Sequence, residues 1–221
     1  RDKFYWLSRE QGTEAAYDTM IGSKNGWLPT TVQLPGGQYM TVASPIGNSK
    51  ISLLFLHLPD GNLTGRGFAG SHYESLQDLL GGGSRLHAVD KQSSYNAQEL
   101  TGALRAIMQV YQPAQIRTQA TVASESFPDH SDHMAASRFA QNAYEQYEQS
   151  QYNGQVDIPL TRYIGYPVRD LQPNVSGDDL AKKQAAFFAY ARFDGAVCYS
   201  MRDCSTTPTY WDYLERQYTD Q

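Results

Sequence analysis

The chain has 221 residues, of which 40% are hydrophobic and 19% charged, and this composition is typical of a globular protein with a sizeable core. Lys and Arg number 18 and Asp and Glu number 23, so the formal net charge is −5 and nothing electrostatic favours nucleic acid as a partner. The longest apolar run, residues 51–58, is much shorter than the roughly 18 residues that a transmembrane segment needs. Composition therefore argues against nucleic-acid-binding and transmembrane classes.

Strand and helix signals alternate along the chain. Residues 4–21 are expected to form a helix that ends at Gly22, and residues 31–34 and 39–43 a hairpin around a Pro-Gly-Gly turn. Residues 51–58 have the apolar run of a strand buried on both faces of a parallel sheet. Further elements are expected as follows: helix 95–111, strand 115–122, helix 131–151, strand 157–166, helix 176–193 and a closing helix at 208–218. This alternation predicts an α/β fold with a mainly parallel sheet, in a single domain over residues 1–221.

Two polar loops follow predicted strands, at residues 59–71 and 124–130. The carboxyl ends of parallel strands lie at one edge of the sheet, which is where open α/β folds bind ligands. We therefore expect the two loops to meet and to form the site.

Two features concern the cellular compartment. Cys198 and Cys204 are close enough in sequence to close a disulfide in an oxidising compartment, although two free thiols are an equally good interpretation. Asn62 and Asn174 each begin an N-glycosylation sequon. Together these features favour a secreted or extracytoplasmic protein.

The densest group of chemically active side chains is Asp129-His130-Ser131-Asp132-His133. Histidine binds zinc and carries protons near neutral pH, and a neighbouring carboxylate orients its ring. One histidine could bind a metal ion while the other handles a proton or an oxyanion. The alternative is a surface loop in which Ser131 or Asp132 caps a helix.

Three motifs carry a resemblance to a known family. His130-Ser131-Asp132-His133 resembles the second signature, His-Pro-Asp-His, of the PIG-L (LmbE-like) zinc-dependent N-acetylglucosaminyl deacetylases, with Ser in place of Pro. Leu58-Pro59-Asp60-Gly61-Asn62 and Arg9-Glu10 agree with that family in order and spacing. The resemblance extends over nearly the whole chain, including the tail with its two cysteines.

The resemblance implies a Rossmann-like three-layer sandwich. It also implies an enzyme that removes acetyl from an N-acetylated amino sugar or glycoconjugate by means of zinc-activated water. By their positions in the motifs, His133 would be a Zn²⁺ ligand and His130 would stabilise or protonate the tetrahedral intermediate. Asp132 would orient the residues around the metal ligands. Arg9 and Asp60 would contact substrate hydroxyls.

One family motif has no counterpart in the chain. The first signature, Ala-His-Pro-Asp-Asp, supplies two zinc ligands and the general base and follows the first strand, but Asp2 is the only acid before the opening helix. We expect that the first strand and this motif are missing from the chain: either the sequence starts after a missing segment, or a separate N-terminal segment that carries the motif is cleaved and stays associated. The alternatives are a catalytically inactive carbohydrate-binding member of the same fold and, less favoured, a phosphoesterase.

Overall fold

The fold is described from a computed structural model, which covers residues 4–122, 128–152, 158–206 and 208–220. Most of the second predicted loop, residues 124–127, lies outside these ranges, as does the start of the strand predicted at 157. The chain divides into two compact units. Unit 1 comprises Arg1–Val32, Met40–Leu56 and Val168–Gln217, and unit 2 comprises Gln33–Tyr39, His57–Pro167 and Tyr218–Gln221. The single domain over residues 1–221 stays a prediction.

Unit 1 is built around two helices, α1 (Phe4–Ile21) and α5 (Gly177–Ala191), which pack against each other. They approach closely at Gly12, where a β-carbon would lie 2.8 Å from the ring of Tyr190. The helix predicted at residues 4–21 is confirmed, and the helix predicted at 176–193 is present with slightly shorter bounds. Two short helices, α6 (Met201–Thr206) and α7 (Pro208–Leu214), follow them in the chain.

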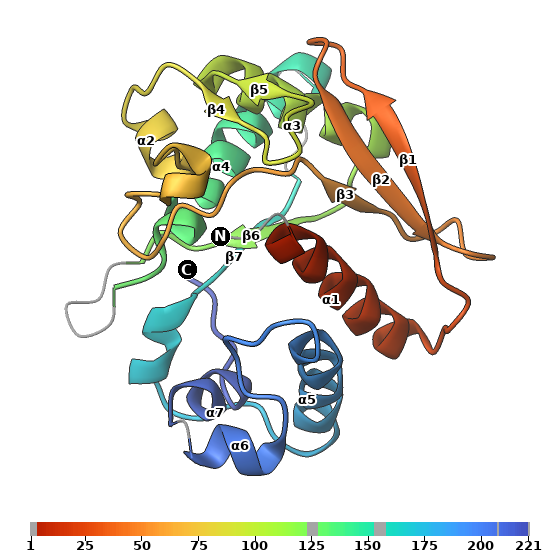
Figure 1. Ribbon diagram of the computed structural model, residues 1–221, viewed down its shortest axis with the longest axis vertical. Helices are drawn as coiled ribbons and strands as arrows, with labels where there is room; N and C mark the ends of the chain where they lie inside the picture. The colour runs from red at the N-terminus through yellow and green to blue at the C-terminus, as the bar shows by residue number, and fades with distance from the viewer. Residues whose placement is uncertain (1–3, 123–127, 153–157, 207, 221) are drawn as a thin grey trace. The chain divides into compact units, whose positions relative to one another are not determined.

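A small antiparallel sheet contains β1 (Trp27–Gln33), β2 (Tyr39–Pro45) and β3 (Leu53–Phe55), in that order (Figure 1). The predicted hairpin is confirmed as β1 and β2. The prediction for residues 51–58, a strand buried on both faces of a parallel sheet, is wrong. This run forms only a three-residue strand, and that strand pairs antiparallel with β2, with Val42 opposite Leu54.

The disulfide between Cys198 and Cys204 is formed, which settles the choice between a bridge and two thiols. Both cysteines are buried in one apolar cluster of unit 1 with Leu214. Partly buried side chains pack around this cluster: Leu180, Phe187, Phe188 and Tyr210. The bridge thus joins the loop after α5 to α6, within the cluster that Leu214 of α7 completes.

Removal of this bridge is expected to lower the free energy of unfolding of the oxidised protein by about 2 kcal/mol, because a short closed loop restricts the unfolded chain. Cys198→Ala with Cys204→Ala should show the loss in urea denaturation followed by circular dichroism. Reduction of the wild type should give a similar loss, and reductant should not change the double variant further. Equal stability of oxidised and reduced wild type would contradict the prediction.

Unit 2 centres on the long helix α4 (Ser131–Tyr152), against which α2 (Leu76–Leu80) and α3 (Ala97–Tyr111) pack. Its remaining elements are two strand pairs and two short 3-10 helices: β4 (Leu86–His87), β5 (Ser94–Tyr95), β6 (Ile116–Gln119), β7 (Leu160–Tyr163), η1 (Ala69–Ser71) and the beginning of η2 (Tyr166–Asp170). The side chains that fill its core are almost completely buried: Leu79, Leu86, Tyr95, Leu100, Phe139 and Tyr147.

The predicted Rossmann-like three-layer sandwich with a mainly parallel sheet is wrong. The described strands form one three-stranded and one two-stranded antiparallel sheet, and the one parallel pair among them is β6 with β7. Parallel pairing needs a long crossover, and α4 supplies one between β6 and β7. The links from β1 to β2 and from β2 to β3 are short loops, so those strands pair antiparallel.

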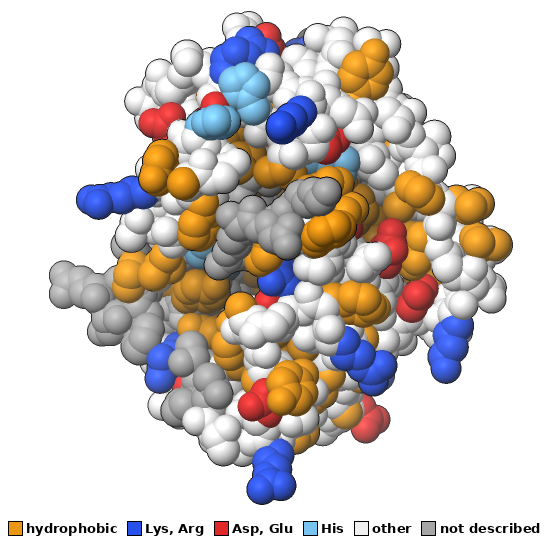
Figure 2. Space-filling view, viewed as in Figure 1, with side chains coloured by type: hydrophobic (Ala, Val, Ile, Leu, Met, Phe, Trp, Pro, Cys, Tyr) orange, Lys and Arg blue, Asp and Glu red, His pale blue; other side chains and the backbone are white. Residues whose placement is uncertain are grey.

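No helix among the described residues is long and apolar enough to cross a lipid bilayer. On the face drawn in Figure 2, Lys and Arg side chains are dispersed among polar and apolar ones.

Candidate functional site

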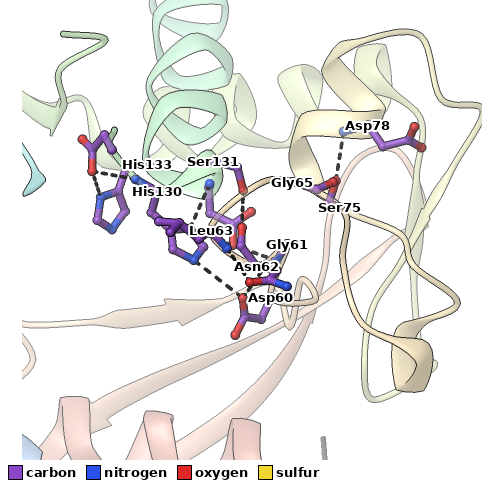
Figure 3. Close-up of polar contacts among 12 residues, drawn as sticks. Asp60, Gly61, Asn62, Leu63, Gly65, Ser75, Asp78, His130, Ser131 and His133 are labelled. Carbon is purple, nitrogen blue, oxygen red and sulfur yellow. Dashed lines mark hydrogen bonds and ion pairs between the residues drawn. The ribbon is translucent and has the colours of Figure 1, made fainter. Parts of the chain in front are cut away.

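The loop that begins at Asp60 is joined to the N-terminus of α4 by hydrogen bonds, all within unit 2 (Figure 3). The Gly61 N–H donates to Asp132 Oδ2 at 2.8 Å, and the Ser131 hydroxyl donates to the Asn62 carbonyl at 2.6 Å. The Ser131 N–H also donates to the Leu63 carbonyl at 3.2 Å. The Asp60 loop and the start of α4, which were expected to meet, therefore do lie together, although no mainly parallel sheet brings them there.

Asp60, His130 and Asp132 form a group that could hold a metal ion, since one ligand atom from each lies within 4.8 Å of the others. His130 Nε2 is 3.9 Å from Asp60 Oδ1, and His130 Nδ1 is 3.6 Å from Asp132 Oδ2. Nδ1 accepts a hydrogen bond from the Asp132 N–H at 3.1 Å, so the ring proton is on Nε2 in the neutral tautomer. For Nε2 to bind a metal ion, that proton must move to Nδ1, which then gives up the hydrogen bond from the Asp132 N–H and faces Asp132 Oδ2 at 3.6 Å as an acceptor.

Asp132 has one carboxylate oxygen without a hydrogen bond. Oδ2 accepts from Gly61, whereas Oδ1 is buried and has no hydrogen-bond partner in the described part of the chain. Burial raises the pKa of Asp132, although the Gly61 N–H and the charge of His130 oppose this shift. An unpaired buried carboxylate oxygen is costly, so this atom is where a cation or a proton would be most strongly stabilised. Gly61 leaves the space for it, because a β-carbon there would overlap Oδ1.

Asp129 fixes the ring of His133. Its Oδ1 lies 2.7 Å from His133 Nδ1 and accepts the backbone N–H groups of His130 and Tyr166 at 2.8 and 3.1 Å. Its side chain is only 1% exposed. Burial opposes ionisation, but the hydrogen bonds from His133 and the two backbone N–H groups keep the pKa of Asp129 below its usual value. The pair leaves His133 Nε2 as the ring nitrogen that Asp129 does not use.

From the sequence, Asp129 belongs to the cluster in which a carboxylate was expected to orient a histidine ring, but that role was not assigned to it. The motif resemblance covers positions 130–133 and so begins one residue too late to include it. The spacing contained a signal, because a carboxylate four residues before His133 is near enough to reach its ring.

Asp129→Asn is expected to destabilise the metal-free protein by about 1–2 kcal/mol at neutral pH, because the amide oxygen accepts the same hydrogen bonds without a charge. Since the folded-state pKa lies below the unfolded value of about 4, the stabilisation is present above pH 4 and is lost as the pH falls through the folded-state pKa. Urea denaturation in EDTA between pH 7 and pH 3 should show the two proteins converging at the acid end. A constant difference over this range would contradict the prediction.

Tyr166 forms an aromatic side of the cluster. Its ring centre lies 5.1 Å from that of His133 and 6.4 Å from that of His130, in edge-to-face arrangements. The two histidine rings are themselves 5.5 Å apart. Packing of this kind restricts both imidazoles in addition to their hydrogen bonds.

Arg9 lies in unit 1, on α1. Its guanidinium contacts Asp194 Oδ1 at 2.8 Å and the Phe193 carbonyl at 2.8 Å, and it lies 4.4 Å from the centre of the Tyr5 ring. These contacts join α1 to the end of α5. They give Arg9 a role in packing, and its predicted contact with substrate stays a prediction.

The two sequon asparagines have different surroundings. Asn62 lies in the Asp60 loop with a left-handed backbone, and its side-chain oxygen accepts the Leu63 N–H at 2.7 Å. Asn174 lies in unit 1, where its side chain both accepts from and donates to the backbone of Gln217, each at 2.8 Å. Glycosylation of either residue stays a prediction.

The chain matches no protein-family model, no curated protein and no solved structure. The resemblance to the PIG-L family therefore stays a prediction drawn from three motifs. What the site can do has to be argued from its own geometry.

Proposed function

We propose that this chain is a metal-dependent hydrolase that removes acetyl from an N-acetylated amino sugar or glycoconjugate. The observation that carries the proposal is the group of Asp60, His130 and Asp132, in which one buried carboxylate oxygen has no hydrogen-bond partner among the described residues. The adjoining Asp129–His133 pair adds a histidine whose ring is already oriented.

We assign two of the metal ligands to Asp60 and His130, whose ligand atoms lie within 4.8 Å of one another. We assign the third to His133 on the motif resemblance, since His133 is not part of that group. Two histidines and one carboxylate are a typical ligand set of hydrolytic zinc sites, which keep a fourth position for water. The ring centres of His130 and His133 lie 5.5 Å apart. Histidine ligands commonly donate their second N–H to a carboxylate, which is how Asp129 contacts His133.

A bound Zn²⁺ supplies a water molecule of pKa about 7, and hence hydroxide near neutral pH. Asp132, whose Oδ1 is unpaired beside this ligand set, is the group that we assign to accept the proton from water and pass it to the leaving amine. This scheme keeps the predicted roles of His133 in metal binding and of Asp132 in catalysis. In this scheme Asp60, which was predicted to contact the substrate, and His130, which was predicted to act on the intermediate, bind the metal ion instead.

The substrate class rests on the motif resemblance, which points to an acetylated amino sugar. An extracytoplasmic location is part of the proposal, and the Cys198–Cys204 disulfide is consistent with it. A separate N-terminal segment with a further metal motif is likewise part of what the resemblance implies.

The test is to strip the purified chain of metal, add one equivalent of Zn²⁺, and measure both binding and acetate release from N-acetylglucosamine oligomers. Zinc binding with acetate release supports the proposal. Zinc binding with hydrolysis of p-nitrophenyl phosphate instead would replace it by a phosphoesterase. Oligomer binding without zinc binding or acetate release would favour the non-catalytic carbohydrate-binding alternative.

A further inference from the structure

His57 and Asp90 form a second histidine–carboxylate pair in unit 2. His57 Nδ1 lies 2.8 Å from Asp90 Oδ2, and the two side chains are only 6% and 11% exposed. The backbone adds a second connection, since the Val89 N–H donates to the His57 carbonyl at 2.7 Å. Asp90 is itself fixed, because its Oδ1 accepts the Gln92 N–H at 3.0 Å. His57 is therefore attached by both backbone and side chain to the turn between β4 and β5.

The backbone of His57 has an unusual conformation. Its φ of +54° is in the left-handed region, which non-glycine residues adopt only in a few per cent of cases, although His does so more often than most. Such a conformation persists only where the surrounding contacts impose it, and the Asp90 and Val89 contacts do so here.

The segment from His57 to Asp60 is stiff. Pro59 has a fixed φ, and a residue before proline, here Leu58, is restricted to extended conformations. The position of His57 therefore largely determines where Asp60 begins. On the other side of Asp60, the Asn62 N–H donates to its Oδ1 at 2.8 Å and the Gly61 N–H donates to Asp132.

We propose that His57, held by Asp90, is a positioning residue that places the Asp60 carboxylate for metal binding. This inference rests on the proposed function, since it concerns the same metal site. The arrangement places one end of the stiff segment on the β4–β5 turn and the other on α4. Loss of the His57–Asp90 contact should release the first end and leave the second intact.

The experiment is Co²⁺ titration of the full chain, followed by the visible absorption of the bound ion. His57→Gly keeps the left-handed backbone but removes the side chain, whereas His57→Asn keeps the backbone preference and places an amide N–H near the position of Nδ1. We expect His57→Gly and Asp90→Ala each to weaken Co²⁺ binding at least tenfold and to alter the spectrum, and His57→Asn to restore both. The double variant His57→Gly with Asp90→Ala should bind Co²⁺ no more weakly than either single variant, because both substitutions remove the same contact. Thermal unfolding of the metal-free variants shows that each is folded.

His87→Ala is the matched control. His87 Nδ1 lies 2.7 Å from Glu74 Oε1, but the histidine side chain is 60% exposed, so its loss should leave Co²⁺ binding unchanged. If the wild type binds no Co²⁺, the proposed function fails. If the wild type binds Co²⁺ and His57→Gly binds it equally well, only the positioning role is overturned, as it also is if His57→Asn resembles His57→Gly.

Discussion

His133→Ala is expected to weaken Zn²⁺ binding about 100-fold or more, because it removes one of three proposed ligands together with the partner of a buried carboxylate. Asp132→Asn is expected to keep most of the affinity and to lower acetate release by 10²- to 10⁴-fold, because the amide cannot accept the proton. Calorimetric titration of the metal-free proteins gives the first quantity, and an acetate assay at saturating zinc gives the second.

The pair of variants separates binding from chemistry. His72→Asn is a suitable control for both, because His72 is an exposed histidine of the same unit and Asn accepts its left-handed backbone. Unchanged zinc affinity in His133→Ala would remove His133 from the ligand set. Full turnover in Asp132→Asn would remove Asp132 from proton transfer.

Gly67→Ala is expected to destabilise the protein by about 2–5 kcal/mol. Gly67 has a φ of +60°, and a β-carbon there would lie 2.6 Å from the carbonyl carbon of Tyr73, a backbone atom that cannot swing aside as a side chain does. The Gly67 N–H also donates to the Gly61 carbonyl at 2.9 Å, so a displaced Gly67 would shift the loop at Asp132. Urea denaturation should show the loss, and zinc affinity should fall with it.

Two other glycines separate the causes. Gly37 has a φ of +88° with nothing within 4 Å of an added β-carbon, so Gly37→Ala should cost only about 1 kcal/mol. Gly102 lies within α3 with the same open space and no positive φ, so Gly102→Ala should stabilise by roughly 0.5–1 kcal/mol. A loss at Gly67 no larger than that at Gly37 would mean that the Tyr73 contact relaxes without cost.

The helices could be predicted from the sequence because their signals are local. The first helix has the bounds expected for it, and α3 ends at Tyr111 as expected. It begins at Ala97 and not at the expected residue 95, because Asn96 caps it in a capping box with Glu99. Apart from the β1–β2 hairpin, whose turn is local, the strand pairing could not be predicted, because strand partners depend on contacts between distant residues. An apolar run such as 51–58 looks the same in a parallel and in an antiparallel sheet.

The site was partly predictable for the same reason. His130, Asp132 and His133 are close in sequence, and Asp60 follows a predicted strand, so their proximity could be expected. The hydrogen bonds that select between roles were not visible in the sequence. The Asp129 contact to His133 depends on a ring orientation, and the His57–Asp90 pair joins residues 33 positions apart through turns that have no sequence signature.

The last residues of the chain form part of unit 2, beside β7. The Tyr218 carbonyl accepts the Ile164 N–H at 2.8 Å, Thr219 bridges Tyr163, and Asp220 contacts Arg162 at 2.9 Å. During synthesis, at about 5–20 residues per second, this ladder has to wait for the whole of the intervening stretch of unit 1 to leave the ribosome. The edge of β7 that residues 218–220 cover therefore stays unpaired for several seconds in nascent unit 2. During this time its backbone groups are open to binding by chaperones.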